Sequence, residues 1–179
     1  MRLRKHTKYS QRYRNKCIKK TSKINYHFLE EYKKEISNSN FSVQIFFVCA
    51  LDEFWSYVGC KSNQCCTWYA LEMSSGKILA CHNGNRSDQD FLVLLKLLES
   101  FPISKFYTDS WGSYSKYIPK EKHQIGKENT WKIERRNLNF RTHISRLNRK
   151  TICFSKSEQI HDNSYRYVYR KILLQKRKI

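Results

Sequence analysis

Three carboxylates are the residues of this chain whose types and spacing could do chemistry together: Asp52, Asp109 and Glu134. Carboxylate oxygens are the ligands that Mg²⁺ prefers, and because this ion keeps several waters, few protein carboxylates suffice to hold it. A pair of such ions can activate an attacking hydroxyl and stabilise the leaving oxygen of a phosphodiester. The spacing alone is weak evidence, because each acid taken singly is more often a solvated or capping carboxylate.

The elements that must position these acids follow from the pattern of apolar residues. The predicted strands are 44–58, 65–73, 77–82, 105–108 and a short one near 123–125. The predicted helices are 26–36, 88–100, about 129–147 and 157–174, and the segment between 109 and 123 is predicted to be a loop. A continuous run of β-branched and aromatic residues favours a buried first strand, and Ser87 with Asp90 forms a capping box for the second helix.

This order predicts an α/β fold, a mixed sheet of ribonuclease H type flanked by helices, with a basic N-terminal arm and a C-terminal helical extension. In such a sheet the strand that leads to Asp109 lies beside the strand that carries Asp52. Glu134 begins the helix that follows, so the three acids can converge. We expect a basic N-terminal segment at 1–40, with residues 1–23 disordered, a catalytic core at 41–150 and a basic C-terminal helix at 151–179.

The charge of the chain is concentrated at its two ends. There are 35 Lys and Arg residues against 15 acids, a formal net charge of +20, while the chain is 40% hydrophobic and 15% aromatic. Residues 41–126 have no net charge, residues 1–40 carry +9 and residues 127–179 carry +11. A surplus of this size attracts polyanions, of which nucleic acid is the commonest. An acidic membrane surface is the rival, but the basic runs lack the apolar face that a surface-bound helix needs.

The sequence argues against membrane-spanning, secreted, disulfide-rich and zinc-binding proteins. The longest apolar stretches fall far short of the roughly 20 residues that span a bilayer, and the first residues have no apolar core of a secretory signal. We therefore expect a cytoplasmic protein without a membrane partner. The cysteines lie at 17, 49, 60, 65, 66, 81 and 153. Because their number is odd and no CxxC pair occurs, we expect neither a disulfide framework nor a zinc site, but small buried hydrophobic residues.

The words around the three acids are more specific than their spacing. LDEFWSYVG at 51–59, YTDSWGSY at 107–114 and IERRNLNFRTHISRLNRK at 133–150 resemble the insertion-sequence-one family of transposases. The FSKS segment at 154–157 and the pair His161-Asp162 continue the match. The resemblance covers about 44–174, in order and without large gaps.

The resemblance implies an Asp-Asp-Glu transposase in which Asp52, Asp109 and Glu134 are the catalytic residues and metal ligands. Twenty-four residues separate the last two acids, which is typical of the family. The implied cofactor is Mg²⁺ or Mn²⁺, as two ions, and the implied partners are double-stranded DNA and further copies of the chain. The implied reaction is nicking at the ends of a mobile element, followed by attack of the freed 3′ hydroxyl on target DNA.

The departure from the family lies at the front of the chain. In the family that this chain resembles, full-length members carry a zinc-binding cysteine cluster and a helix-turn-helix before the catalytic core. Here Cys17 is the single cysteine in the first 40 residues. We therefore expect a catalytic half without the N-terminal zinc finger. Two alternatives stay open: a non-catalytic DNA-binding regulator or truncated remnant of the transposase, and a cellular ribonuclease or resolvase of the same fold.

The remaining polar residues are interpreted more modestly. Six cations follow Glu134 without an intervening acid, which favours phosphate contact; they are Arg135, Arg136, Arg141, Arg146, Arg149 and Lys150. Glu53 points to the opposite face of the strand from Asp52, so we expect a supporting role. Trp55 and Trp111 are expected to pack rather than to stack on bases, and His143 and His161 are not expected to shuttle protons.

Overall fold

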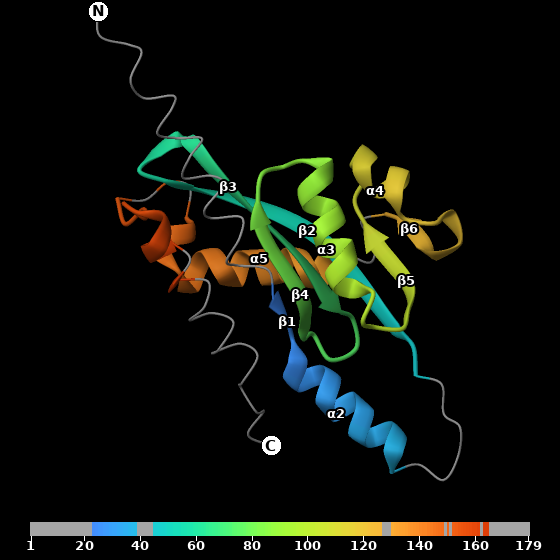
Figure 1. Cartoon of the computed structure of the whole chain (residues 1–179). Helices are drawn as coiled ribbons and strands as arrows, with labels where there is room; N and C mark the ends of the chain where they lie inside the picture. Colours follow the sequence, from blue (N-terminus) through green and yellow to red (C-terminus); the bar gives the residue numbers. More distant parts are fainter. Residues whose placement is uncertain are drawn as a thin grey trace, which may run out of the picture.

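A mixed sheet of six strands lies at the centre of the computed structural model (Figure 1), which describes residues 23–38, 45–126, 130–148, 150, 152–161 and 163–164. Its strands are β1 (Lys23–Ile24), β2 (Phe47–Val58), β3 (Cys60–Glu72), β4 (Ile78–Gly84), β5 (Ile103–Thr108) and β6 (His123–Ile125). Their order across the sheet is β1-β4-β3-β2-β5-β6. The meander from β2 to β4 is antiparallel, and β5 and β6 join it in parallel.

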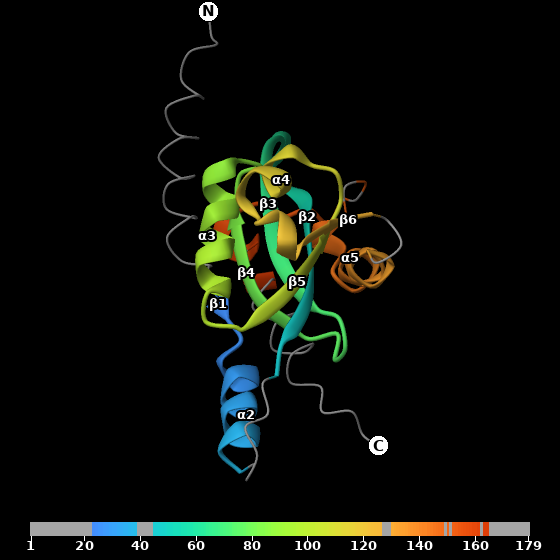
Figure 2. The same cartoon turned by 90° about the vertical axis from the view of Figure 1, so that its right-hand side faces the viewer.

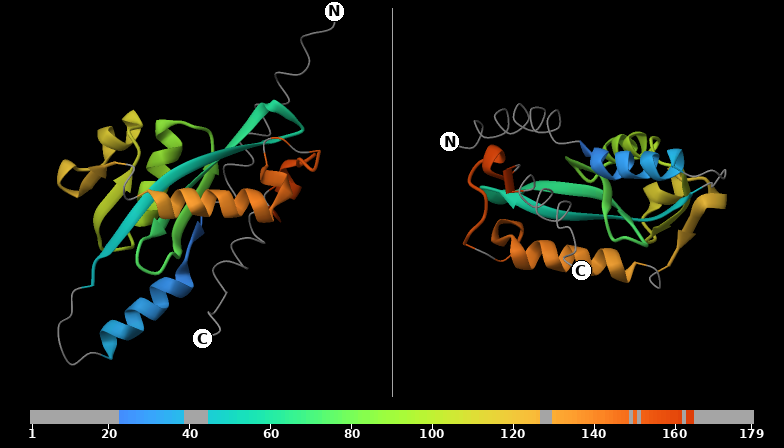
Figure 3. Two further views of the ribbon diagram at one scale, coloured as in Figure 1. Left: turned by 180° about the vertical axis from the view of Figure 1, so that it is seen from behind. Right: turned by 90° about the horizontal axis from the view of Figure 1, so that it is seen from below.

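Helices cover both faces of this sheet (Figure 2). They are α2 (Tyr26–Ser37), α3 (Asp88–Leu98), α4 (Gly112–Tyr117) and α5 (Trp131–His143), with 3₁₀ turns η1 (Lys120–Lys122) and η3 (Ser145–Leu147). α3 and α5 lie on opposite sides of the sheet, and the view from below in Figure 3 shows the three layers. Among the described residues, no helix is long and apolar enough to cross a membrane.

The alternation of side chains along β2 explains why both faces are covered. Leu51 packs into the core beneath α3 and α4, whereas Ala50 and Phe54 pack into the core beneath α5. Successive residues of a strand point to opposite faces, so a strand that is apolar at nearly every position must be buried on both. Asp52 shares the α5 face with Ala50 and Phe54, and it is therefore the polar interruption of that core.

Part of the C-terminal segment is attached to the far end of β2. Ser155 forms a parallel bridge with Val58, and its carbonyl accepts a hydrogen bond from the Gly59 N–H at 2.8 Å. The ring of His161, which is 1% exposed, lies between two serines: Nε2 is 2.9 Å from Ser56 Oγ, and Nδ1 is 2.9 Å from Ser155 Oγ. These contacts fix residues 155–161 on the side of the sheet that carries α5.

The structure confirms the predicted meander and the placement of β5 beside β2, and it corrects several bounds. The segment predicted as a loop after Asp109 contains α4. Burial of the Tyr114 ring against Phe91 stabilises this short helix. The helix predicted to reach 147 ends at His143 and is followed by η3. The predicted helix 157–174 is helical at 158–161 and 163–164, and its remainder lies outside the described residues, as does the predicted arm before Lys23.

Candidate active site

Two of the three acids lie on neighbouring parallel strands. Ala50 of β2 is paired in register with Tyr107 of β5. Two residues further along each strand come Asp52 and Asp109, the latter immediately after the end of β5. Because a step of two residues keeps the same face of a sheet, both aspartates belong to the α5 side, where Ala50 and Tyr107 already pack. The pairing of β2 with β5 therefore brings the two aspartates together.

A polar contact from α5 orients the first aspartate. Asn137 donates its side-chain amide to Asp52 Oδ2, at 2.5 Å, while the backbone N–H of Glu53 donates to Asp52 Oδ1 at 2.9 Å. Tyr69, the cross-strand partner of Asp52 on β3, donates its hydroxyl toward Asn137 Oδ1 at 2.7 Å and also lies 3.1 Å from the Ile133 carbonyl. Sequence reasoning assigned no role to Asn137 or Tyr69, although Asn137 lies three residues after Glu134 on the same helix face.

The second aspartate and the glutamate are both exposed. Asp109 Oδ1 accepts the backbone N–H of Trp111 at 2.9 Å, which leaves its other oxygen toward solvent. Glu134 lies in the first turn of α5, and its Oε1 accepts the hydroxyl of Thr130 at 3.2 Å. Among the residues that the structure describes, no three His, Cys, Asp or Glu side chains are grouped closely enough to hold a metal ion. Glu134 thus lies on α5, on the side of the sheet that carries the aspartates, but its carboxylate is not close enough to them to form a three-ligand metal site.

The electrostatics of the site favour a cation. Burial, together with the negative charges of Glu53 and Asp109, raises the pKa of Asp52 to about 7, against the opposing hydrogen bonds from the Glu53 N–H and Asn137. A buried carboxylate beside other carboxylates is unfavourable unless a positive charge compensates it. The donor set, carboxylate oxygens partly open to solvent, is the chemistry that hard divalent ions prefer. These residues therefore fit a Mg²⁺-type ion.

Glu53 points to the other face of the sheet, as predicted. Its carboxylate accepts the hydroxyl of Tyr114 at 2.8 Å and pairs with Arg86 at 2.6 Å. Burial raises the pKa of Glu53, while the contacts with Tyr114 and Arg86 oppose that rise. Both oxygens of Glu53 thus have partners on the α4 side of the sheet, where Glu53 links β2 to α4. Glu53 therefore lies on the opposite face from Asp52 and Asn137.

Trp111 packs in an aromatic cluster, as predicted, rather than standing free for base stacking. Its ring centroid is 5.1 Å from that of Trp68 and 5.3 Å from that of Tyr114, and the Arg86 guanidinium lies 5.3 Å from the ring. Because Trp111 follows Asp109 by two residues, this packing fixes the backbone N–H that holds the Asp109 carboxylate. Trp55 on β2 is half-buried.

Two cations of α5 anchor the helix to the turn between β3 and β4. Lys132 Nζ donates to the Met73 carbonyl at 2.7 Å, and Arg136 Nη2 donates to the Gly76 carbonyl at 2.6 Å. Gly76 has φ +66°, a conformation that favours glycine. Glu72 holds the same turn by accepting the backbone N–H of Ser74 at 2.8 Å. Arg136 was expected to contact phosphate, but in this structure its half-buried guanidinium is already engaged by the turn.

The other expected phosphate-binding residues differ in exposure. Arg135 and Lys150 are exposed, Arg141 and Arg146 are half-buried, and Arg149 lies outside the described residues. His143 is exposed at the end of α5, and His161 is buried between its two serines, which gives it a packing role. Cys49, Cys66 and Cys81 are buried as expected, whereas Cys60 and Cys153 are exposed because they lie on the β2–β3 hairpin tip and a surface loop.

Comparison with known proteins places this chain in a family. The family model described as IS1 transposase matches residues 46–173. The InsB protein of insertion element iso-IS1n from Shigella dysenteriae is 50% identical over 115 residues, which cover 64% of this chain and 88% of the relative. The InsB protein of IS1 from Shigella flexneri is 41% identical over 116 residues, with the same coverage of each chain.

A solved structure shows the same fold. The catalytic core domain of BIV integrase superposes with a TM-score of 0.52 at 12% identity, covering 74% of this chain and 87% of that one. The chain thus has a ribonuclease H-like fold. Within that fold class, the chain belongs to the IS1 transposase family. It is accordingly a transposase of a mobile insertion element.

Proposed function

We propose that this chain cleaves and joins DNA strands with Asp52, Asp109 and Glu134 as its catalytic carboxylates and a divalent metal, Mg²⁺ or Mn²⁺, as its cofactor. The observation that carries the proposal is the placement of Asp52 on β2 and of Asp109 immediately after the paired strand β5, on the face covered by the helix that bears Glu134. Double-stranded DNA at the element's ends and at the target is the substrate, and the chain acts as a homo-oligomer.

The chain's own residues prepare this site for a metal. Asn137 and the Glu53 N–H fix both oxygens of Asp52, and the Trp111 N–H fixes one oxygen of Asp109. Glu134 is exposed and accepts a hydrogen bond from the neutral hydroxyl of Thr130, so its side chain can adopt other rotamers at little cost. When bound at these carboxylates, a pair of divalent ions supplies an activated attacking hydroxyl and stabilises the leaving oxygen.

A gel assay tests the proposal with DNA that carries the element's own ends. Mg²⁺-dependent nicking by the wild-type chain should disappear in Asp109→Asn and in Glu134→Gln, while DNA binding persists in both. Glu99→Gln, at an exposed acid on the α3 side of the sheet, is the matched control and should nick like the wild type. Nicking that survives in Asp109→Asn would refute the assignment.

The alternative is a DNA-binding regulator without catalysis. The observation that favours it is the engagement of Glu134 with Thr130 rather than with the two aspartates. This alternative predicts equal DNA binding by the wild type and Glu134→Gln, with no nicked product under Mg²⁺ or Mn²⁺ for either. The two hypotheses therefore differ in the wild-type lane of the same gel.

A further inference from the structure

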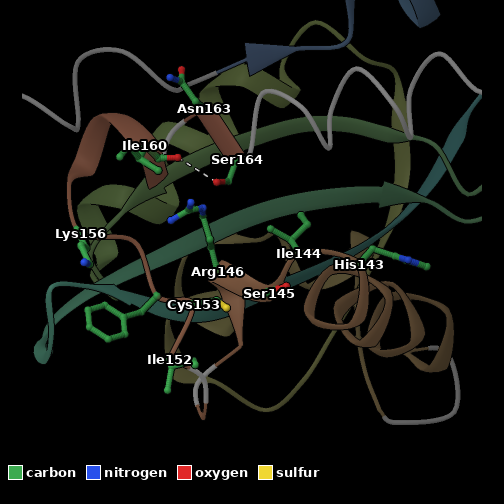
Figure 4. A pocket seen from close by; sticks show the side chains of 11 residues that line it. His143, Ile144, Ser145, Arg146, Ile152, Cys153, Lys156, Ile160, Asn163 and Ser164 are labelled. Atoms are coloured by element: carbon green, nitrogen blue, oxygen red, sulfur yellow. Dashed lines mark hydrogen bonds between the residues drawn. The ribbon is translucent and has the colours of Figure 1, made fainter.

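A hollow of about 780 Å³ lies beyond the C-terminal end of α5, away from the three carboxylates (Figure 4). The end of α5, part of η3 and several residues of the segments 152–156, 160 and 163–164 line it. Its volume falls within the range of about 300–1,000 Å³ that small-ligand sites occupy. The site described above does not use this hollow.

The charge of the lining is positive. Among the described residues, two permanent cations, Arg146 and Lys156, line it, and no carboxylate does. Neither cation forms an ion pair with any acid among the described residues. Arg146 is half-buried, and Figure 4 shows its side chain between Cys153 and the helical segment that carries Ile160 and Ser164. A partly desolvated guanidinium without a counter-charge is unfavourable by itself, so the hollow suits an anion.

Apolar side chains form the rest of the wall. Ile152 is 92% exposed and Ile160 is 43% exposed, and both line the hollow beside the cations. Ser145 and Asn163 add polar groups to the lining. A ligand that presents a negative charge next to an apolar surface matches this combination, and a nucleotide of a DNA strand, with its phosphate and its base, is such a ligand.

The position of the hollow agrees with a DNA strand running along α5. His143, at the end of the helix, lies nine positions after Glu134, which at 1.5 Å per residue is about 14 Å. A DNA strand advances about 3.4 Å per nucleotide along its axis. We propose that this hollow binds the phosphate and sugar or base of one substrate nucleotide, about four or five nucleotides from the phosphodiester at the carboxylates. The inference rests on the proposed function for its substrate, DNA.

The first test measures how DNA binding by the full chain depends on salt, in EDTA so that no metal chemistry intervenes. The probe is a fluorescein-labelled duplex read by anisotropy. Lys156→Gln and Arg146→Gln should each lower the affinity several-fold and reduce the slope of log K against log salt by about 0.9, the value for one phosphate contact. Lys96→Gln, at an exposed lysine of α3 on the opposite face, is the control and should leave the slope unchanged. If Lys156→Gln and Arg146→Gln, the hollow variants (below also called the pocket variants), keep the wild-type slope of log K against log salt, the inference is overturned.

The second test needs no substitution. Cys153 lines the hollow and is exposed, whereas Cys60 is exposed on the β2–β3 hairpin, outside the lining. Duplex DNA should slow maleimide labelling of Cys153 several-fold relative to Cys60, measured by mass spectrometry of the labelled peptides. Labelling of Cys153 that DNA leaves unchanged overturns the inference. So does labelling that slows with protein concentration alone, since a second copy of the chain would then cover the hollow.

Both tests remain separate from the test of catalysis. If nicking fails in every chain but the pocket variants still lose their phosphate contact, the binding inference stands and the catalytic proposal falls. If the wild type nicks DNA and the pocket variants bind it normally, only the binding inference falls.

Discussion

Acid should loosen the attachment of the C-terminal segment to β2 through one buried imidazole. Burial and, to a smaller extent, the nearby positive charge of Arg146 together lower the pKa of His161 to about 4. In an unfolded or detached segment the same ring has a pKa of about 6.5. The attached state therefore favours the neutral ring. As the pH falls, the ring of the detached segment is protonated first, which favours detachment.

The size of the effect follows from the two pKa values. The attached state has its full stability above pH 6.5 and loses it progressively as the pH falls from about 6.5 to about 4. A difference of about 2.5 pH units at 1.36 kcal/mol each corresponds to roughly 3 kcal/mol. Because the ring is 1% exposed, solvent screening leaves this value largely intact.

The assay compares urea unfolding of the wild type and His161→Gln at several values between pH 7 and pH 4. Glutamine keeps hydrogen-bonding groups for Ser56 and Ser155 but does not titrate, so the carboxylates that also respond to acid cancel between the two proteins. The wild type should lose about 3 kcal/mol more than the variant over this range, while His27→Gln, at an exposed ring of α2, should follow the wild type. Equal losses in wild type and His161→Gln would refute the reasoning, as would an NMR titration of His161 near pH 6.5.

Three further substitutions have expected effects on DNA nicking or on stability. Tyr69→Phe removes the hydroxyl beside Asn137 and should lower nicking more than DNA binding, because Asn137 then no longer orients Asp52 as firmly; single-turnover nicking set against anisotropy checks this. Ser87→Ala removes the cap of α3 and should lower the free energy of unfolding by about 1 kcal/mol in urea titrations. Gly84→Ala places a methyl group against the buried carboxylate of Asp90 and should lower the melting temperature more than Ser87→Ala does, as calorimetry would show.

Much of the fold could be predicted because apolar periodicity and capping residues are local signals. The run at the start of β2, the turn around Gly76 and the cap at Ser87 are each legible in a few neighbouring residues. α4 was missed because its helix depends on the burial of Tyr114 among residues of α3 and β3, which is a long-range contact. The early end of α5 was missed because the apolar stripe continues through Ile144 and Leu147 after the helix has stopped.

The site divides in the same way. The positions of the aspartates follow from strand order, so the sequence could predict their meeting. Asn137 and Tyr69 could not be assigned in advance, since an amide and a phenol acquire their role from the face on which they land. Arg136 shows the opposite case: its charge suggested phosphate, yet the proximity of the Gly76 carbonyl gave it another partner.

Because Lys132 and Arg136 anchor α5 to the β3–β4 turn, that turn sets the position of α5 relative to the candidate active site. Glu134 lies midway between these two residues, so the length and shape of a surface turn set how far along the sheet the glutamate stands from the aspartates. An insertion or deletion in that turn would shift the helix lengthwise while leaving every carboxylate in the chain. Loss of activity in such a copy of the element would then arise from misregistration, and an inventory of catalytic residues would not reveal it.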